Sequence, residues 1–166
     1  MASRFGFASL IPLGLVVDSV DGSKDALVVT ARSNALTALC PLCGAASDRV
    51  QSHYIRQPSG LPCAGRRVRL RLLVRRFQCS IPVCPRQAFA ERFGMTVLAE
   101  RARRTGRLEE IVHYLGLAMG SRPGAAFAQR LMLPISNDTL LRVVLSALAP
   151  GSQLFLIGAC WVTHSA

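Results

Sequence analysis

The sequence predicts an α+β fold in which a β-hairpin and a cysteine-rich segment with strands come first and three short helices follow. Three observations support this prediction: a turn signal between two apolar runs before residue 32, a strictly alternating run at 68–72, and helical spacing of apolar residues within 108–146. With 166 residues, the chain is long enough for one modest domain or two very small ones.

The first segment, residues 1–37, is expected to hold the hairpin. Asp21-Gly22-Ser23 separates one apolar stretch from Leu27-Val28-Val29-Thr30, which is typical of two strands joined by a tight turn. Residues 5–17 also imitate the apolar part of an export signal, but no A-x-A cleavage pattern follows, so a strand is favoured. In a cytoplasmic protein, paired cysteines are interpreted as metal ligands before they are interpreted as disulfides.

The next segment, residues 38–92, holds two cysteine pairs that predict a structural Zn²⁺ site. Cys40-Pro41-Leu42-Cys43-Gly44 is a tight turn in which Gly44 permits a positive φ, and the second pair, Cys79 and Cys84, has a wider spacing than usual. Four thiolates satisfy tetrahedral zinc, and strands between two such turns would form a zinc ribbon. Ordinary thiols and a redox pair are the alternatives. The predicted metal ligands are Cys40, Cys43, Cys79 and Cys84.

Three further residues of ligand type are left out of the predicted zinc site. Cys63 has no partner at ligand spacing, and Cys160 lies far away near the end of the chain. His53 stands among arginines and is interpreted as a surface or DNA-facing residue.

Positive charge is concentrated in the middle of the chain. The formal net charge is +11, and 19 of the 20 cationic residues are arginine, which suits bidentate contact with phosphate. No carboxylate occurs between Arg49 and Arg86, whereas a merely solvated face, the alternative, usually mixes both signs. The alternation of 68–72 places Arg69 and Arg71 on one face of a strand. The predicted DNA contacts here are Arg66, Arg67, Arg69, Arg71, Arg75 and Arg76.

Residues 93–107 are expected to form an arginine-rich connector, and residues 108–146 three helices. Leu108, Ile111, Val112, Leu115 and Met119 share one stripe of the first helix. Ser121-Arg122-Pro123-Gly124 is interpreted as a break before a helix that covers 125–131. Ser136 is predicted to cap the last helix, whose buried face would be Leu140, Leu141, Val144 and Leu145.

The last two helices have the length and spacing of a helix-turn-helix, although a plain helical bundle fits the periodicity equally well. In a helix-turn-helix, the second helix enters the major groove by its N-terminal end. The residues it would offer to DNA are Ser136, Asn137, Thr139 and Arg142.

Several function classes are excluded by what the sequence lacks. The longest apolar run has nine residues, Leu154 to Val162, whereas a membrane-spanning helix needs about 20. No nucleotide-binding loop, nucleophile triad or small-molecule site is visible. Two-metal cleavage of DNA needs clustered carboxylates, but after Asp138 the chain has no acidic residue at all. We therefore expect no catalytic residue and no enzyme activity.

Several motifs together resemble the start of bacterial insertion-sequence transposases of the ISL-three family. The resemblance runs in order through roughly residues 10–145. It is carried by Cys40-Pro41-Leu42-Cys43-Gly44, 47–54, Leu61-Pro62, Val68-Arg69-Leu70-Arg71-Leu72, 74–79, Cys84-Pro85-Arg86, 89–92, 103–108 and 134–142.

The resemblance implies a zinc-binding domain, here with Cys40, Cys43, Cys79 and Cys84, followed by a helix-turn-helix at about 108–145. It also implies binding to double-stranded DNA at the terminal inverted repeats of the element. In that family, a DDE catalytic domain follows. Residues 147–166 depart from the pattern, and we interpret them as an out-of-frame tail of a truncated transposase, cytoplasmic and associated with the nucleoid.

Two other functions stay open at this point. One is a stand-alone zinc-containing transcription regulator that competes for the ends of the element. The other is an RNA-binding ribbon, which the few aromatic residues among the arginines make less attractive. The DNA sequence that is recognised is not fixed by these patterns, and neither is formation of a homo-oligomer.

Overall fold

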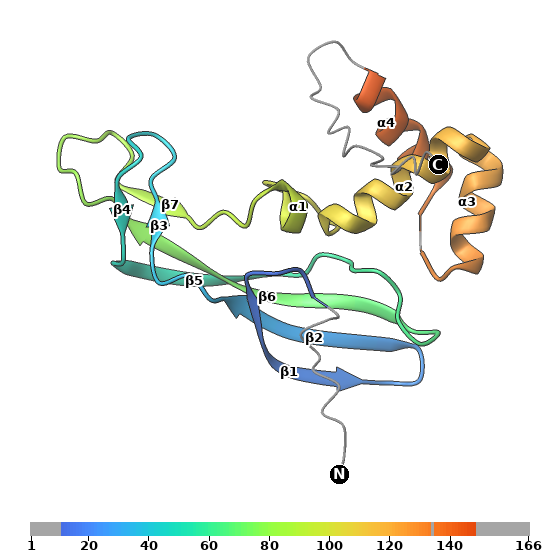
Figure 1. Cartoon of the computed structure of the whole chain (residues 1–166), viewed down its shortest axis with the longest axis horizontal. Coiled ribbons are helices and arrows are strands. Elements are labelled where there is room, and N and C mark those ends of the chain that lie inside the picture. Colours follow the sequence, from blue (N-terminus) through green and yellow to red (C-terminus); the bar gives the residue numbers. More distant parts are fainter. Residues whose placement is uncertain (1–10, 134, 149–166) are drawn as a thin grey trace, which may run out of the picture.

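A computed structural model describes residues 11–133 and 135–148 and consists of β-strands followed by four helices (Figure 1). The strands are β1 (Leu15–Gly22), β2 (Ala26–Ser33), β3 (Ala38–Leu39), β4 (Ala46–Ser47), β5 (Val50–Arg56), β6 (Arg67–Gln78) and β7 (Ala88–Ala90). The helices are α1 (Met95–Leu98), α2 (Gly106–Met119), α3 (Ser121–Arg130) and α4 (Asn137–Leu148). The predicted order of a hairpin, a strand-containing segment and helices is confirmed.

The main sheet has the strand order β1-β2-β6-β5, and β7 also pairs with the end of β6. β1 and β2 form the predicted hairpin, with Ser23 donating its N–H to the Ala26 carbonyl at 2.8 Å in the connection. β2 then runs parallel to β6, while β5 and β7 are antiparallel to it. The predicted segments 1–37 and 38–92 therefore share one sheet.

The long strand β6 contributes to two separate cores. Val68, Leu70, Leu72 and Val74 alternate along one face and pack with β2 and with Leu98 of α1. Further along the strand, Phe77 is fully buried in a second, smaller core beside the cysteines. Alternation of side chains across a strand makes this possible, because even and odd positions point to opposite faces.

Backbone hydrogen bonds attach the helices to the sheet. Ser59, in the connection from β5 to β6, donates to the Arg103 carbonyl at 2.9 Å and accepts from the N–H of Thr105 at 3.0 Å. Thr105 is buried, and α2 begins directly after it. In Figure 1 the helices α2–α4 lie at one end of the molecule, and β3, β4 and β7 lie at the other.

The helices α2, α3 and α4, called the trihelical unit below, pack around a core of their own. Leu108 and Val112 of α2, Ala125 and Ala128 of α3, and Leu140 of α4 are buried in it. Gly116 allows close contact of α2 with α4, since a Cβ at that position would lie 2.5 Å from Cγ2 of Val144. No helix in the described residues is long and apolar enough to cross a membrane.

Two details of the helical prediction are wrong. Residues 121–124 do not break the chain but form the first turn of α3, because a proline in a first turn removes an N–H that has no partner within the helix. Leu141 and Leu145 are 49% and 56% exposed, whereas Leu140 is buried and Val144 half-buried. The proposed out-of-frame tail lies, apart from residues 147 and 148 at the end of α4, outside the described residues.

Candidate metal centre and basic surface

The four predicted ligands come together at the end of the molecule that holds β3, β4 and β7. The Sγ atoms of Cys40, Cys43, Cys79 and Cys84 all lie within 4.8 Å of one another. Cys40 and Cys84 are 4.0 Å apart, and Cys43 and Cys79 are 3.5 Å apart. Tetrahedral zinc with Zn–S bonds of about 2.3 Å requires S···S edges of about 3.8 Å. The sulfur positions therefore fit one zinc ion.

Each cysteine pair stands at the tip of a small hairpin. Around the first pair, β3 pairs with β4, the N–H of Cys40 bonds the Ala45 carbonyl at 2.8 Å, and the N–H of Gly44 bonds the Cys40 carbonyl at 2.9 Å. Gly44 has φ 73°, as the sequence predicts for this turn. The second hairpin joins β6 to β7, and the N–H of Cys79 bonds the Gln87 carbonyl at 2.8 Å.

Two serine hydroxyls hold the hairpins against each other. Ser47, which is buried, donates to the Gln78 carbonyl at 2.6 Å, and Ser80 donates to the Ala46 carbonyl at 2.9 Å. Behind the sulfurs, Phe77 and Phe89 stack with ring centroids 6.0 Å apart. This core is too small to be self-sufficient, so a bound metal would contribute directly to its folding.

The backbone around the sulfurs makes the cysteines unequal. The N–H groups of Cys43 and Leu42 bond the Cys40 sulfur, and the first of them is the main reason why the pKa of Cys40 falls from 9.0 to about 6, although burial opposes the shift. The N–H of Ile81 lowers the pKa of Cys79, but burial and the neighbouring sulfurs together raise it to about 12. The thiolate form is thus favoured at Cys40 and disfavoured at Cys79.

The residues left out of the predicted site lie elsewhere or outside the described residues. Cys63 is half-buried, stands in the turn before β6 and packs against the main core. His53 is exposed on β5, as the sequence predicts. Cys160 lies outside the described residues.

The predicted alternation of β6 is confirmed, and it exposes a row of arginines. Arg67, Arg69 and Arg71 are exposed at alternate positions, opposite in parity to the buried Val68 and Leu70. We call these three residues the arginine face. Their register partners on β2 are Ala26, Val28 and Thr30, and β5 on the other side of β6 carries no acidic residue.

The other predicted arginines lie around this face rather than on it. Arg66 is exposed in the turn that leads into β6, and Arg76 is exposed but has the opposite parity to Arg71. The Arg75 side chain has partners within the protein. It bonds Glu91 through two nitrogens, at 2.7 and 3.1 Å, and the Ala35 carbonyl at 2.8 Å. Its surroundings therefore favour a structural role over the predicted contact with DNA.

The predicted recognition residues occupy the start of α4. Ser136 caps this helix, since its Oγ accepts from the N–H of Thr139 at 3.3 Å and bonds Thr139 Oγ1 at 2.9 Å. These two hydroxyls are thus already engaged. Asn137 and Arg142 are exposed, and Arg142 makes a long bond of 3.4 Å to the Asp138 carbonyl.

A family comparison finds one match in the chain. Residues 37–86 match the zinc-finger of transposase IS204/IS1001/IS1096/IS1165, a zinc ribbon of the ISL-three type. This match contains all four clustered cysteines and the arginine face. No curated protein and no solved structure matches the chain. Residues 37–86 therefore carry the zinc ribbon of these transposases, with Cys40, Cys43, Cys79 and Cys84 placed to bind zinc.

Proposed function

We propose that this chain is a DNA-recognition part of a transposase of the ISL-three type and that it binds the terminal inverted repeats of an insertion sequence. The observation that carries the proposal is the row of exposed arginines within residues 37–86, the same matched zinc ribbon that holds the four clustered cysteines. Four like charges in Arg66, Arg67, Arg69 and Arg71 repel one another, and a polyanion such as DNA relieves this repulsion.

In this proposal the ribbon and the trihelical unit have different tasks. The arginine face contacts phosphates and supplies affinity that is independent of sequence. The pair α3 and α4 acts as a helix-turn-helix, with Asn137 and Arg142 reading base edges in the major groove. The exposure of both side chains near the start of α4 supports this assignment.

Strand cleavage is not part of the proposed activity. The one group of three or more potential metal ligands within the described residues is the cysteine cluster, and four thiolates would fill the coordination sphere of zinc. A zinc ion held in this way is structural, because a catalytic one keeps a position open for water or substrate.

The test is binding of the zinc-loaded chain to a duplex that carries the ends of the element and to a scrambled duplex of equal length. Fluorescence anisotropy at several salt concentrations should give tighter binding to the element ends, with affinity for both duplexes falling by about 0.9 log units per log unit of salt for each phosphate contacted. Equal affinity for both duplexes would refute recognition of the ends. Nicking of either duplex in the presence of Mg²⁺ would refute the proposal that this chain binds DNA without cleaving it.

A further inference from the structure

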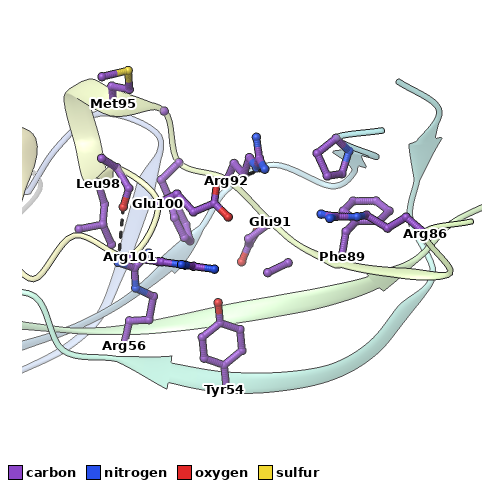
Figure 2. Close-up of a pocket in the computed structure, with 15 residues that line it drawn as sticks. Tyr54, Arg56, Arg86, Phe89, Glu91, Arg92, Met95, Leu98, Glu100 and Arg101 are labelled. Carbon is purple, nitrogen blue, oxygen red and sulfur yellow. Dashed lines mark hydrogen bonds and ion pairs between the residues drawn. The ribbon is translucent and has the colours of Figure 1, made fainter. Parts of the chain in front are cut away.

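A second basic surface, separate from the arginine face, lines a groove between β5 and α1. The groove has a volume of about 870 Å³ and is bounded by Tyr54 and Arg56 of β5, by Arg86 before β7, and by the chain from Phe89 to Arg101 (Figure 2). Sites of roughly 300–1,000 Å³ hold ligands of one or a few rings. The groove is therefore of a size for a nucleotide rather than for a duplex.

The groove has an excess of positive charge that the protein does not neutralise. Four arginines line it against two glutamates, and both glutamates are already paired. Glu91 is bound by Arg75 at 2.7 Å, and Glu100 by Arg92 at 3.2 Å.

Two of the four arginines in the groove, Arg86 and Arg101, are exposed and unpaired within the described residues. Arg56 donates to the carbonyls of Ala99 and Ala102, at 3.5 and 2.6 Å, and so fixes the turn after α1. Arg86 and Arg101 are exposed and make no ion pair with any residue that the structure describes. These two guanidinium groups are free to bind an anion.

Arg101 lines the groove from a left-handed backbone position. Arg101 has φ 60° and stands in a turn closed by the N–H of Ala102 and the Ala99 carbonyl at 3.1 Å. Glycine is the residue that such a left-handed position prefers. Figure 2 shows the Arg101 guanidinium extending into the groove, above the hydroxyl of Tyr54. An arginine thus occupies a backbone position that alone would favour glycine.

Tyr54 supplies an aromatic surface beside these cations. Tyr54 is 41% exposed although its register partner Val74 on β6 is fully buried. An exposed aromatic ring next to arginines in a groove is the combination with which proteins hold unpaired bases, the ring stacking on the base and the cations contacting the backbone.

We propose that this groove binds one unpaired nucleotide, with its phosphate at Arg101 and its base on the ring of Tyr54. This inference rests on the proposed DNA-binding function and adds to it a site for a single-stranded end. The same chemistry is offered by a free mononucleotide, so the test includes both sources.

The experiment compares the zinc-loaded full chain on a blunt DNA hairpin and on the same hairpin with a short single-stranded extension. By fluorescence anisotropy, the extension should tighten binding about tenfold. Arg101→Gly, which the backbone accepts, and Tyr54→Ala should remove this advantage while leaving the blunt hairpin bound as before. Tyr54→Phe should keep it. Arg130→Ala, which removes one exposed charge on α3, is the matched control and should also keep it.

A second arm titrates the chain with deoxyadenosine monophosphate and with inorganic phosphate, read by tyrosine fluorescence and thermal shift. The mononucleotide could bind to the parent chain but not to Tyr54→Ala or Arg101→Gly, while the single-stranded extension does not tighten hairpin binding. This result would assign the groove to free nucleotides. The same affinity for both hairpins, with no mononucleotide binding, would overturn the proposal. Loss of binding to the blunt hairpin in Arg69→Ala/Arg71→Ala tests the proposed function separately.

Discussion

Arg75 and Glu91 form an ion pair between β6 and the residue after β7, with Nη2 of Arg75 2.7 Å and Nε 3.1 Å from Oε2 of Glu91. Oε1 of Glu91 also accepts the backbone N–H of Arg75 at 2.9 Å. The Glu91 side chain is 5% exposed, and the Arg75 guanidinium group lies 5.0 Å from the ring centre of Phe77. This pair ties the main sheet to the ribbon core.

Replacing Arg75 should therefore affect folding more than binding. Arg75→Ala leaves the buried Glu91 carboxylate without its cation, and we expect a loss of about 2–4 kcal/mol in the free energy of unfolding, measured in urea. Arg71→Ala, on the exposed arginine face, should change stability by less than about 0.5 kcal/mol. If Arg75→Ala folds as stably as the parent chain but binds DNA more weakly, the internal role of Arg75 is wrong.

Zinc should be required for the ribbon but not for the trihelical unit. Cys43→Ser removes a ligand, so we expect the chain to lose its one zinc ion and the fixed packing of Phe77 on Phe89. Helical circular dichroism from α2–α4 should remain, since their core is separate.

Cys63→Ser is the matched control for this change. It also removes a free thiol, but one outside the cluster, and it should keep one zinc per chain by elemental analysis. Full zinc content in Cys43→Ser, or loss of zinc in Cys63→Ser, would contradict the assigned ligand set.

Zinc binding should release protons from the cysteines whose pKa is raised, Cys79 and Cys84, rather than from Cys40, whose pKa is lowered. With a pKa of about 6, Cys40 is mainly thiolate at pH 7, whereas the raised pKa values of Cys79 and Cys84 keep both protonated. Zinc needs all of them as thiolates, so binding at pH 7 expels the protons of Cys79 and Cys84, and affinity rises with pH. Calorimetry in buffers of different ionisation enthalpy measures the number of protons released.

Mutations in the two proposed DNA-binding surfaces, the arginine face and the start of α4, should have different effects on DNA binding. Arg69→Ala/Arg71→Ala should weaken binding to every duplex and reduce the salt slope by about two, since each arginine accounts for about one phosphate contact. Asn137→Ala or Arg142→Ala should cost about 1–3 kcal/mol on the preferred duplex and much less on a scrambled one. Anisotropy on both duplexes measures the difference, and an equal loss on both in all variants would refute the division of tasks.

Much of the local structure could be predicted because it depends on local signals. The hairpin, the alternation of 68–72 and the cap at Ser136 are each set by residues within a few positions, although the hairpin turn lies at 23–25, just after the predicted Asp21-Gly22. The cysteine cluster could also be predicted, although its two pairs are far apart in sequence, because two closely spaced pairs of cysteines together supply the four thiolates of a tetrahedral zinc site.

What the sequence could not reveal depends on distant parts of the chain. The parallel pairing of β2 with β6 has no sequence signature, and it merges the hairpin with the ribbon. The sequence favours a DNA contact for Arg75 because no carboxylate is near it in the chain, yet β7 brings Glu91 to it. The groove at Tyr54 and Arg101 joins three separate segments, so no local pattern marks either residue.

The close contact of α2 with α4 gives a last prediction, on the stability of the trihelical unit. In Gly116→Ala the new Cβ would lie 2.5 Å from Cγ2 of Val144 and 3.6 Å from Cδ2 of Leu140. We expect the helices to separate and the unit to lose about 1–3 kcal/mol, although alanine is the better helix former. Val144→Ala removes the clashing methyl groups and should restore part of this loss in the double variant. Thermal unfolding followed at the helical signal measures both changes, and a Gly116→Ala chain more stable than its parent would show that α2 and α4 are not in close contact.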